Sequence, residues 1–425
     1  MRTWKVVRRA EPLNWGSFLL FGLALLLSLG ISGLMLSSQG KPGLHGILLL
    51  LEGGFGHDYA LEDTLLKSIP IFLCSAGVAV CFRMQVWNIG AEGQYALGAI
   101  GATAAVLLMP EAPMWLLMPG MLLAAMLAGA LWAAIPALLR LRFRMNEIIS
   151  SLMLNYVGIS LLEHLVYGPW KDPDGSGFPM SIPFPEAGVV PPLFGRVHWG
   201  LVVCLAVGLA LSFFFKRTRL GYEVQVGGEN PKAARYAGMP YAFLVLFVLC
   251  LCGALAAVAG GMETSATVGR LRPNVAVGYG YTAIVVAWLA RLRISRIAFF
   301  SFLLAGLRVG VENLQIELQV PAAFAGMIEG CILLTVLAFQ FFETYKLQWR
   351  NKAGTEDGQG GILEYMQGAG VDFVRAGDGA VPRTNTQEPA LSNAREPHAC
   401  TVDNAVSHDA GNPASSEVDG KEEGA

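Results

Sequence analysis

The sequence predicts an all-α integral membrane protein with about ten transmembrane helices. Three observations support this fold class. Of the 425 residues, 54% are hydrophobic and only 15% are charged, whereas soluble domains carry about 25% charged residues. The apolar residues gather in runs long enough to cross a bilayer, and the basic residues concentrate between alternate runs. The low charge argues against a disordered chain, a soluble enzyme or a nucleic-acid-binding protein.

Ten apolar segments have the length that a membrane span requires. A hydrocarbon core about 30 Å thick needs about 20 apolar residues per helix. The first segment is long and is followed by no small-residue cleavage site, which predicts an uncleaved helix rather than a signal peptide. The eighth and ninth are short and contain glycine. The ten predicted spans are Ser17–Leu36, Leu65–Phe82, Ile89–Met109, Met114–Leu139, Ile148–Tyr167, Trp199–Phe215, Tyr241–Gly261, Tyr279–Ala290, Ile297–Val311 and Ala322–Phe342.

The basic residues predict the orientation. If the N-terminus lies inside, 18 of the lysines and arginines in residues 1–350 fall on the cytoplasmic side and 7 lie on or near the external side. Cytoplasmic loops of membrane proteins are enriched in these residues. We therefore expect a multi-pass protein of the cell (inner) membrane with both termini in the cytoplasm.

The composition also divides the chain into parts. Residues 1–16 form a short cytoplasmic N-terminus, and residues 17–346 form the transmembrane domain, with a cytoplasmic loop at 216–240. Residues 351–425 hold 13 acidic and 5 basic residues and few apolar ones, which predicts a disordered cytoplasmic tail. The external stretch 168–196 holds seven prolines and should be extended or turned rather than helical.

The segment from residue 87 to residue 95 places polar groups where the third span enters the membrane. Asn88 and Glu92 would share one face of a helix, and Gly90 and Gly93 would permit a break or a close helix contact. Such polar groups are costly in lipid, and broken helices line transporter cavities. Either Asn88 caps an ordinary helix whose first turn holds Glu92, or the segment is a break in the translocation path.

The loop after the sixth span predicts a short helix outside the bilayer. Asn230 is a favourable N-cap, Pro231 suits the first helical position and Gly238 suits the end of the helix. Its alanines make the helix slim enough to enter a groove of another protein. A solvated connecting helix is the alternative that residue chemistry leaves open.

Glycines and tyrosines at residues 278–282 open the eighth span. Tyr279 and Tyr281 could offer rings and hydroxyls to a small polar ligand, or they could anchor the helix at the membrane interface. In the ninth span, Arg308 and Glu312 are spaced to neutralise each other.

Sequence signatures of catalysis are missing. The chain has no G-x-x-x-x-G-K-[ST] phosphate loop, no H-E-x-x-H, no zinc or redox cysteine spacing and no nucleophile constellation. We therefore expect no enzyme activity, no metal site and no cofactor in this chain. An energy source would have to come from a partner.

Four motifs in order resemble a known family: Asn88–Gln94, Asn146–Ile149 with Leu154–Tyr156, Gly228–Gly238, and Gly278–Thr282. They are similar to permease subunits of bacterial ABC importers of the ribose/simple-sugar and nucleoside type, most of all to the longer permease of nucleoside systems that use BMP-type lipoproteins. The resemblance runs from about Glu62 to Glu343. It implies two inverted halves of helices and a pair of permeases around one pathway. It also implies ABC ATP-binding subunits that hold ATP and magnesium inside, and a substrate-binding protein or lipoprotein outside.

The resemblance also implies roles for individual residues. The coupling helix, which would dock on the ATPase, comprises Glu229, Asn230, Pro231, Ala233, Ala234, Arg235 and Gly238. The expected substrate pathway includes Asn88, Glu92, Gln94, Tyr95, Asn155, Tyr279 and Tyr281.

The expected function is that of the permease subunit of an ATP-driven importer of a nucleoside or simple sugar, with either an identical or a related second permease. The alternative is an ion-coupled secondary transporter, whose proton or ion relay would have to use Glu92, Glu163 and Glu312.

Overall fold

The computed structural model of the chain describes residues 3–8, 16–175, 177–350, 373–376 and 379–382. The chain divides into a helical unit, Trp4–Trp349, and a second unit made of Met1–Thr3 and Arg350–Ala425. Apart from the hairpin of β5 (Phe373–Ala376) and β6 (Gly379–Pro382), the predicted tail lies outside the described residues.

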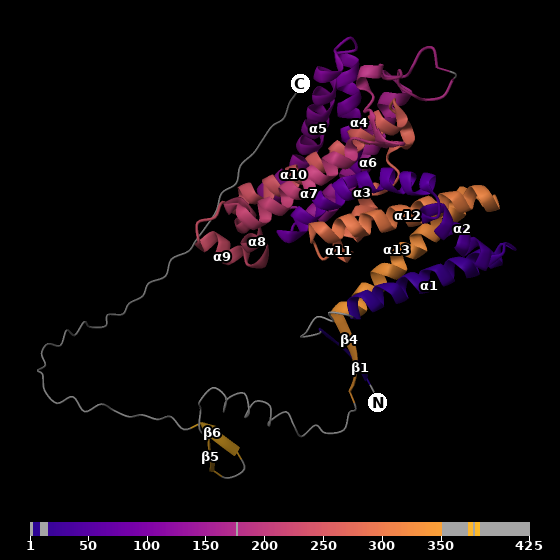
Figure 1. The fold of residues 1–425 in the computed structure, drawn as a ribbon. Helices are drawn as coiled ribbons and strands as arrows, with labels where there is room; N and C mark the ends of the chain where they lie inside the picture. The colour runs from indigo at the N-terminus through magenta and orange to yellow at the C-terminus, as the bar shows by residue number, and fades with distance from the viewer. Residues whose placement is uncertain (1–2, 9–15, 176, 351–372, 377–378, 383–425) are drawn as a thin grey trace, which may run out of the picture. The chain divides into compact units, whose positions relative to one another are not determined.

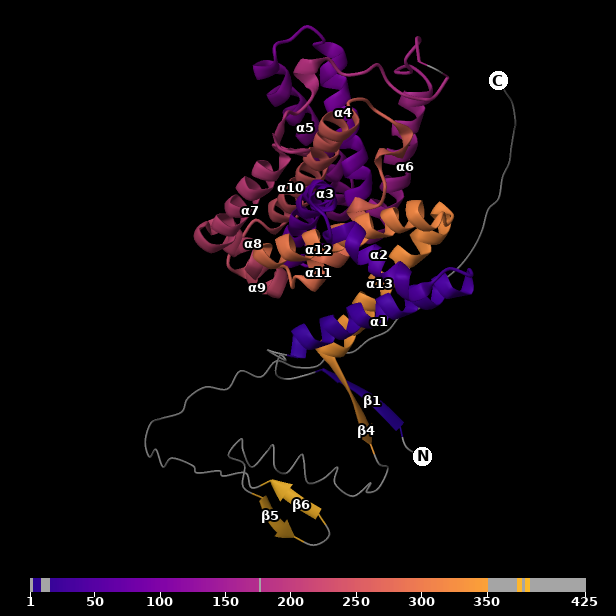
Figure 2. The same ribbon diagram turned by 45° about the vertical axis from the view of Figure 1, so that its right-hand side comes forward.

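The described residues form thirteen α-helices, which confirms the all-α class (Figures 1 and 2). In chain order the helices are α1 (Gly16–Ser38), α2 (Gly43–Phe55), α3 (Asp58–Arg83), α4 (Ala91–Leu108), α5 (Met114–Phe143), α6 (Glu147–Tyr167), α7 (Gly200–Arg217), α8 (Arg219–Glu229), α9 (Pro231–Tyr236), α10 (Tyr241–Glu263), α11 (Tyr279–Leu289), α12 (Ile294–Leu318) and α13 (Ala322–Thr344). Short helical turns are η1 (Glu186–Gly188), η2 (Thr264–Val268) and η3 (Pro273–Val275), and β1 (Thr3–Arg8) pairs with β4 (Tyr345–Arg350).

Each of the ten predicted spans corresponds to one of these helices. Eight of the described helices are long and apolar enough to cross a membrane: α1, α3, α5, α6, α7, α10 with η2, α12 and α13. The shorter α4 and α11 account for the other two predicted segments. The chain is therefore a multi-pass membrane protein.

Several helices differ from the prediction. Helix α8 lies in the loop at 216–240, where only the shorter helix after Asn230 was predicted, and α3 begins at Asp58, seven residues before the predicted start at Leu65. Helix α2 was not predicted, and it packs against α1, α3 and α12. Helix α12 continues to Leu318, seven residues past the predicted end at Val311. Glu312 stays in the helix and forms ion pairs with Lys67 and Arg308.

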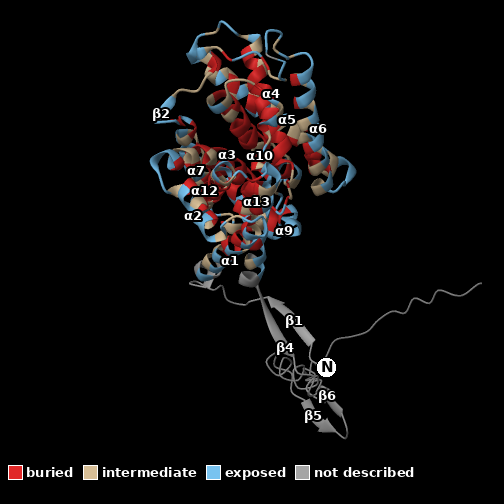
Figure 3. Cartoon of the chain, turned by 90° about the vertical axis from the view of Figure 1, so that its right-hand side faces the viewer, coloured by how far each residue is buried: buried red, intermediate tan, exposed pale blue. Residues whose placement is uncertain are grey.

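The centre of the helical unit is formed by α3, α4 and α10. Figure 3 shows these helices largely in the colour of buried residues. Helix α4 packs against α5, α6, α10 and α11. Outer helices instead expose large apolar side chains such as Leu131 on α5 and Leu205 on α7, as expected of surfaces that face lipid.

The proline-rich stretch between α6 and α7 contains no α-helix in its described residues, as predicted. It holds an isolated bridge between Lys171 and Ser181, the turn η1, and an antiparallel pair of β2 (Pro192–Phe194) and β3 (Val197–His198). His198 is buried beside the start of α7, and its Nδ1 accepts a hydrogen bond from the Gly200 N–H at 3.0 Å.

Candidate functional site

The centre of the site is the junction between the start of α4 and the start of α11. Glu92, in the first turn of α4, is 1% exposed. Its two carboxylate oxygens accept hydrogen bonds from the backbone N–H groups of Gly278 and Gly280, both at 2.6 Å. A carboxylate at the N-terminus of a helix satisfies unpaired N–H groups and complements the helix dipole. Glu92 therefore caps α11, 186 residues further along the chain.

Gly278 and Gly280, at the start of α11, are required by this geometry. Gly278 precedes the helix with φ of +93°, a conformation that favours glycine. A Cβ atom on Gly280 would lie 2.4 Å from the backbone nitrogen of Glu92, so only glycine permits the close contact. Two motifs that the sequence singled out separately thus form one structural unit.

Asn88 does not cap α4, so that interpretation is wrong. Gly90 occupies the N-cap position, without a side-chain cap. Asn88 is fully buried and its Oδ1 accepts a hydrogen bond from the Gly90 N–H at 2.9 Å. Its Nδ2 donates to Gln94 Oε1 at 3.0 Å and to Cys252 Sγ at 3.1 Å. Asn88 therefore closes the turn that leads into α4 and links it to α10.

Asn155 connects α6 to both partners of the junction. Its Oδ1 accepts a hydrogen bond from the Gly93 N–H at 2.8 Å. Its Nδ2 lies 2.7 Å from the carbonyl oxygen of Ile89 and 3.3 Å from the hydroxyl of Tyr281. With these bonds Asn88, Gln94 and Asn155 have partners inside the chain, and their contact with a substrate stays a prediction.

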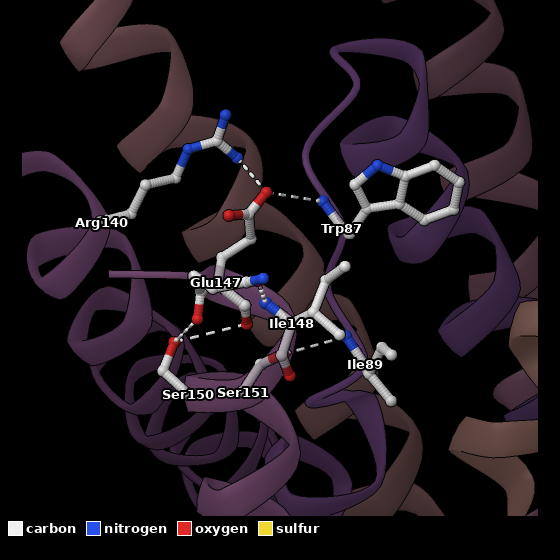
Figure 4. A network of polar contacts seen from close by, with 8 residues as sticks. Trp87, Ile89, Arg140, Glu147, Ile148, Ser150 and Ser151 are labelled. Carbon is white, nitrogen blue, oxygen red and sulfur yellow. Dashed lines mark hydrogen bonds and ion pairs between the residues drawn. The ribbon is translucent and has the colours of Figure 1, made fainter. Parts of the chain in front are cut away.

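The first turn of α6 holds a further set of contacts that sequence reasoning missed (Figure 4). Glu147 forms an ion pair with Arg140 of α5 and accepts a hydrogen bond from the Trp87 N–H at 3.5 Å. Ser151 Oγ accepts a bond from the Ile89 N–H at 3.1 Å. Glu147 belongs to the Asn146–Ile149 motif, which contributed to the family resemblance but was not predicted to form these contacts. These bonds fix the irregular segment between α3 and α4.

Tyr95 and Tyr279 meet at the side of the junction. Their ring centroids are 5.9 Å apart in an edge-to-face arrangement. Both side chains are buried, and the Tyr95 hydroxyl has no hydrogen-bond partner among the described residues. The guanidinium of Arg308 lies over the Tyr279 ring, 4.7 Å from its centroid.

A polar cavity of about 470 Å³ adjoins Tyr279. Sequence reasoning missed the residues that give the cavity its charge: Lys67, Glu263 and Arg272, joined by Arg308 and Glu312. The signal for Lys67 was a single charge in an otherwise apolar predicted span, whereas Glu263 and Arg272 follow the seventh predicted span. Of the seven predicted pathway residues, Tyr279 lines this cavity and the other six do not.

Arg308 holds one wall of this cavity in place. It donates to the carbonyl oxygen of Val277 at 2.6 Å and lies 3.7 Å from Glu312 and 3.5 Å from Glu329. The expected pairing of Arg308 with Glu312 is therefore present. Glu163, which an ion relay would require, is instead exposed on α6.

The short helix predicted after the sixth span is present as α9. Asn230 Oδ1 accepts hydrogen bonds from the N–H groups of Lys232 and Ala233 at 3.1 and 3.0 Å, and Pro231 occupies the first turn. Gly238 follows the helix with φ of +73°. The capping expected from the sequence is confirmed.

The exposed face of α9 differs from the predicted one at one position. Ala234 is fully buried within this chain, so the expectation that it faces a partner is wrong. The exposed residues of the predicted set are Glu229, Asn230, Pro231, Ala233, Arg235 and Gly238. Tyr236 is 93% exposed, and the sequence analysis did not include it.

Comparison with known proteins decides the family. Residues 60–337 match the family described as the permease component of the branched-chain amino acid transport system. The chain belongs to this family. It is 36% identical over 352 residues to the glucose ABC transporter permease protein TsgB13 of Haloferax volcanii, covering 80% of this chain and 92% of that protein. It is 30% identical over 323 residues to the guanosine ABC transporter permease protein NupP of Bacillus subtilis, covering 74% and 91%.

This membership identifies the chain as an ABC transporter permease rather than an enzyme, located in the cell membrane. Among solved structures, PsaBC from Streptococcus pneumoniae in complex with Fab aligns with a TM-score of 0.40 at 13% identity, covering 70% of this chain and 95% of that chain.

Proposed function

We propose that this permease imports a nucleoside or a simple sugar, driven by ATP hydrolysis on a separate subunit. The observation that carries the proposal is the similarity to TsgB13 and NupP, a glucose and a guanosine permease, over more than 90% of the length of each. The cavity beside Tyr279 is compatible with such solutes, because it combines an aromatic ring with charges of both signs. Polar uncharged ligands with hydroxyl groups can bond to either sign.

The coupling would begin at α9. Its exposed face would dock on the ATP-binding subunit, and α8 and α9 both contact α10. Helix α10 packs against α4, whose Glu92 holds the start of α11. Movement of α9 would therefore reach the cavity through a continuous series of packed helices. A second permease and an external substrate-binding protein complete the proposed importer.

Two substitutions at neighbouring alanines test the docking face. Ala233→Trp adds bulk to the exposed face, and overfilling a close-packed interface costs about 1–3 kcal/mol. Because 1.4 kcal/mol is a tenfold change in binding, co-purification of the ATP-binding subunit should fall by roughly one to two orders of magnitude. The thermal stability of the permease should not change. Ala234→Trp should instead lower the stability of the permease itself.

Uptake measurements test the energy source and the solute. Cells that express the complete importer should accumulate labelled guanosine or glucose in a manner that depends on ATP and persists when ion gradients are abolished. Uptake that follows an ion gradient, with no ATP-binding subunit co-purifying, would contradict the proposal. A Trp variant at Ala233 that retains both its ATPase and its uptake would contradict the docking face.

A further inference from the structure

A groove of about 680 Å³ runs between α3, α7 and α12, apart from the site described above. Its walls are mainly apolar, with four serines among the lining residues, and include Phe72 on α3, Leu205 and Leu209 on α7, and Ala298 on α12. Leu205 and Leu209 are 65% and 64% exposed. On α7 the lining runs from Leu201 to Ser212, a length of about 17 Å at 1.5 Å per residue. Leu193 of β2 also lines the groove, which therefore follows most of the length of α7.

One end of this groove is basic. Lys216 and Arg217 lie in the last turn of α7, one turn beyond Ser212 of the groove lining. Arg293 and Arg296 lie on either side of Ile294 and Ser295, which line the same groove at the start of α12. All four side chains belong to exposed residues.

Arg83 at the end of α3 brings the two basic segments together. Its guanidinium lies 3.9 Å from the centroid of the Phe215 ring, and its Nε donates to the carbonyl oxygen of Leu292 at 3.2 Å. Phe215 directly precedes Lys216, and Leu292 directly precedes Arg293. The ends of α7 and α12 therefore converge on one guanidinium, and their basic side chains extend from the same end of the groove.

Among the described residues, no carboxylate pairs with these four basic side chains, although other basic residues nearby do have acidic partners. Arg140 pairs with Glu147 and Arg219 pairs with Glu223. Within the part of the chain that the structure describes, Lys216, Arg217, Arg293 and Arg296 form no ion pair. The general enrichment of lysine and arginine in cytoplasmic segments explains why these four residues lie on the cytoplasmic side of the membrane. It does not explain why unpaired charges of two helices gather where an open apolar groove ends.

We propose that this groove binds an anionic phospholipid, with an acyl chain along the apolar walls and the phosphate at Lys216, Arg217, Arg293 and Arg296. Basic pockets between transmembrane helices on the cytoplasmic side bind anionic headgroups. Arginine and lysine form charge-assisted bonds with phosphate oxygens. A zwitterionic phospholipid would fill the groove equally well but would leave most of the positive charge unbalanced.

The first test removes charge from the basic end. The intact permease, purified in detergent, is titrated with phosphatidylglycerol or phosphatidylcholine, and bound lipid is counted by native mass spectrometry. The wild type should retain phosphatidylglycerol in preference to phosphatidylcholine. Lys216→Gln with Arg293→Gln should weaken phosphatidylglycerol binding roughly 30-fold, since each basic side chain near an anionic headgroup contributes roughly fivefold. The control, Arg142→Gln with Arg144→Gln, removes two exposed charges from the end of α5 and should retain wild-type binding.

The second test fills the groove without changing the charge. Ala298→Phe places a ring inside the groove at an exposed position of α12, and it should reduce retention of both lipids. Ala206→Phe adds the same ring to an exposed position of α7 outside the lining and should have no effect.

Three results would overturn the proposal. The first is equal phosphatidylglycerol binding by the two double variants. The second is no preference of the wild type for phosphatidylglycerol over phosphatidylcholine. The third is covalent crosslinking of an Ala298→Cys variant to a second copy of the chain in native membranes, because the groove would then be filled by protein.

Discussion

Replacing Glu92 with glutamine removes one of the two carboxylate oxygens that bond the start of α11. Both oxygens accept a backbone N–H at 2.6 Å, and the residue is 1% exposed. Glutamine has nearly the same size, but its amide group presents N–H toward one of the two backbone donors. An unpaired buried donor costs about 1–3 kcal/mol, and loss of the charge weakens the remaining bond. We therefore expect a loss of roughly 2–4 kcal/mol in the free energy of unfolding.

The measurement compares Glu92→Gln with Glu163→Gln, the same substitution at an exposed position of α6. At a few degrees of Tm per kcal/mol, the Glu92 variant should unfold roughly 5 °C or more below the wild type, and the Glu163 variant close to it. ATP-driven uptake by the Glu92 variant should fall further than its amount in the membrane. Glu92→Ala should behave in the same way, with a larger effect. Equal Tm and equal uptake for the Glu92 and Glu163 variants would refute the assignment of the junction.

Three further predictions concern other parts of the chain. Gly280→Ala should lower Tm and uptake, because its Cβ would lie 2.4 Å from the Glu92 nitrogen, whereas Gly326→Ala, with open space around it, should change neither. Burial lowers the pKa of His198 from 6.5 to about 4, so the unfolded chain binds more protons between these values and stability should fall as pH drops from 6.5 toward 4. The loss should reach roughly 3 kcal/mol, measured as Tm against pH, and His198→Gln should remove this part of the pH dependence. Truncation after Arg350 should leave uptake largely intact, and loss of uptake at normal membrane levels of the truncated protein would contradict this.

The sequence predicted the positions of the membrane spans better than it predicted how the helices pack against one another. Length and hydropathy locate a span because the bilayer imposes both. Helix α2 has 13 residues, too few for a span, and it buries Gly53 and Gly54 against Asn313 and Gly306 of α12. Such a helix depends on tertiary contacts that no local pattern encodes.

At the site too, features that depend on neighbouring residues were predictable, whereas contacts between distant residues were not. The sequence identified Glu92 and the glycines of residues 278–280 as unusual, but their bonds join residues 186 positions apart. The capping of α9 was predictable because it depends on residues within one turn. Which alanine of α9 faces outward was not predictable, because alanines at neighbouring positions fall on both faces of a short helix. Ala233 is exposed and Ala234 is buried.

The contact between α1 and α13 has a consequence for the order of assembly during synthesis. Helix α1 packs against α2 and α13, and Figures 1 and 2 show the first and last helices side by side. About 280 residues separate the end of α1 from the start of α13, which a ribosome adding 5–20 residues per second needs roughly 15 to 60 seconds to make. Until α12 is made, whose Phe300 meets Phe21 of α1, α1 has α2 and lipid as its neighbours, while α3, α4 and α10 can already assemble. Closure of the bundle around α1 is therefore a late event that depends on insertion of the final helix.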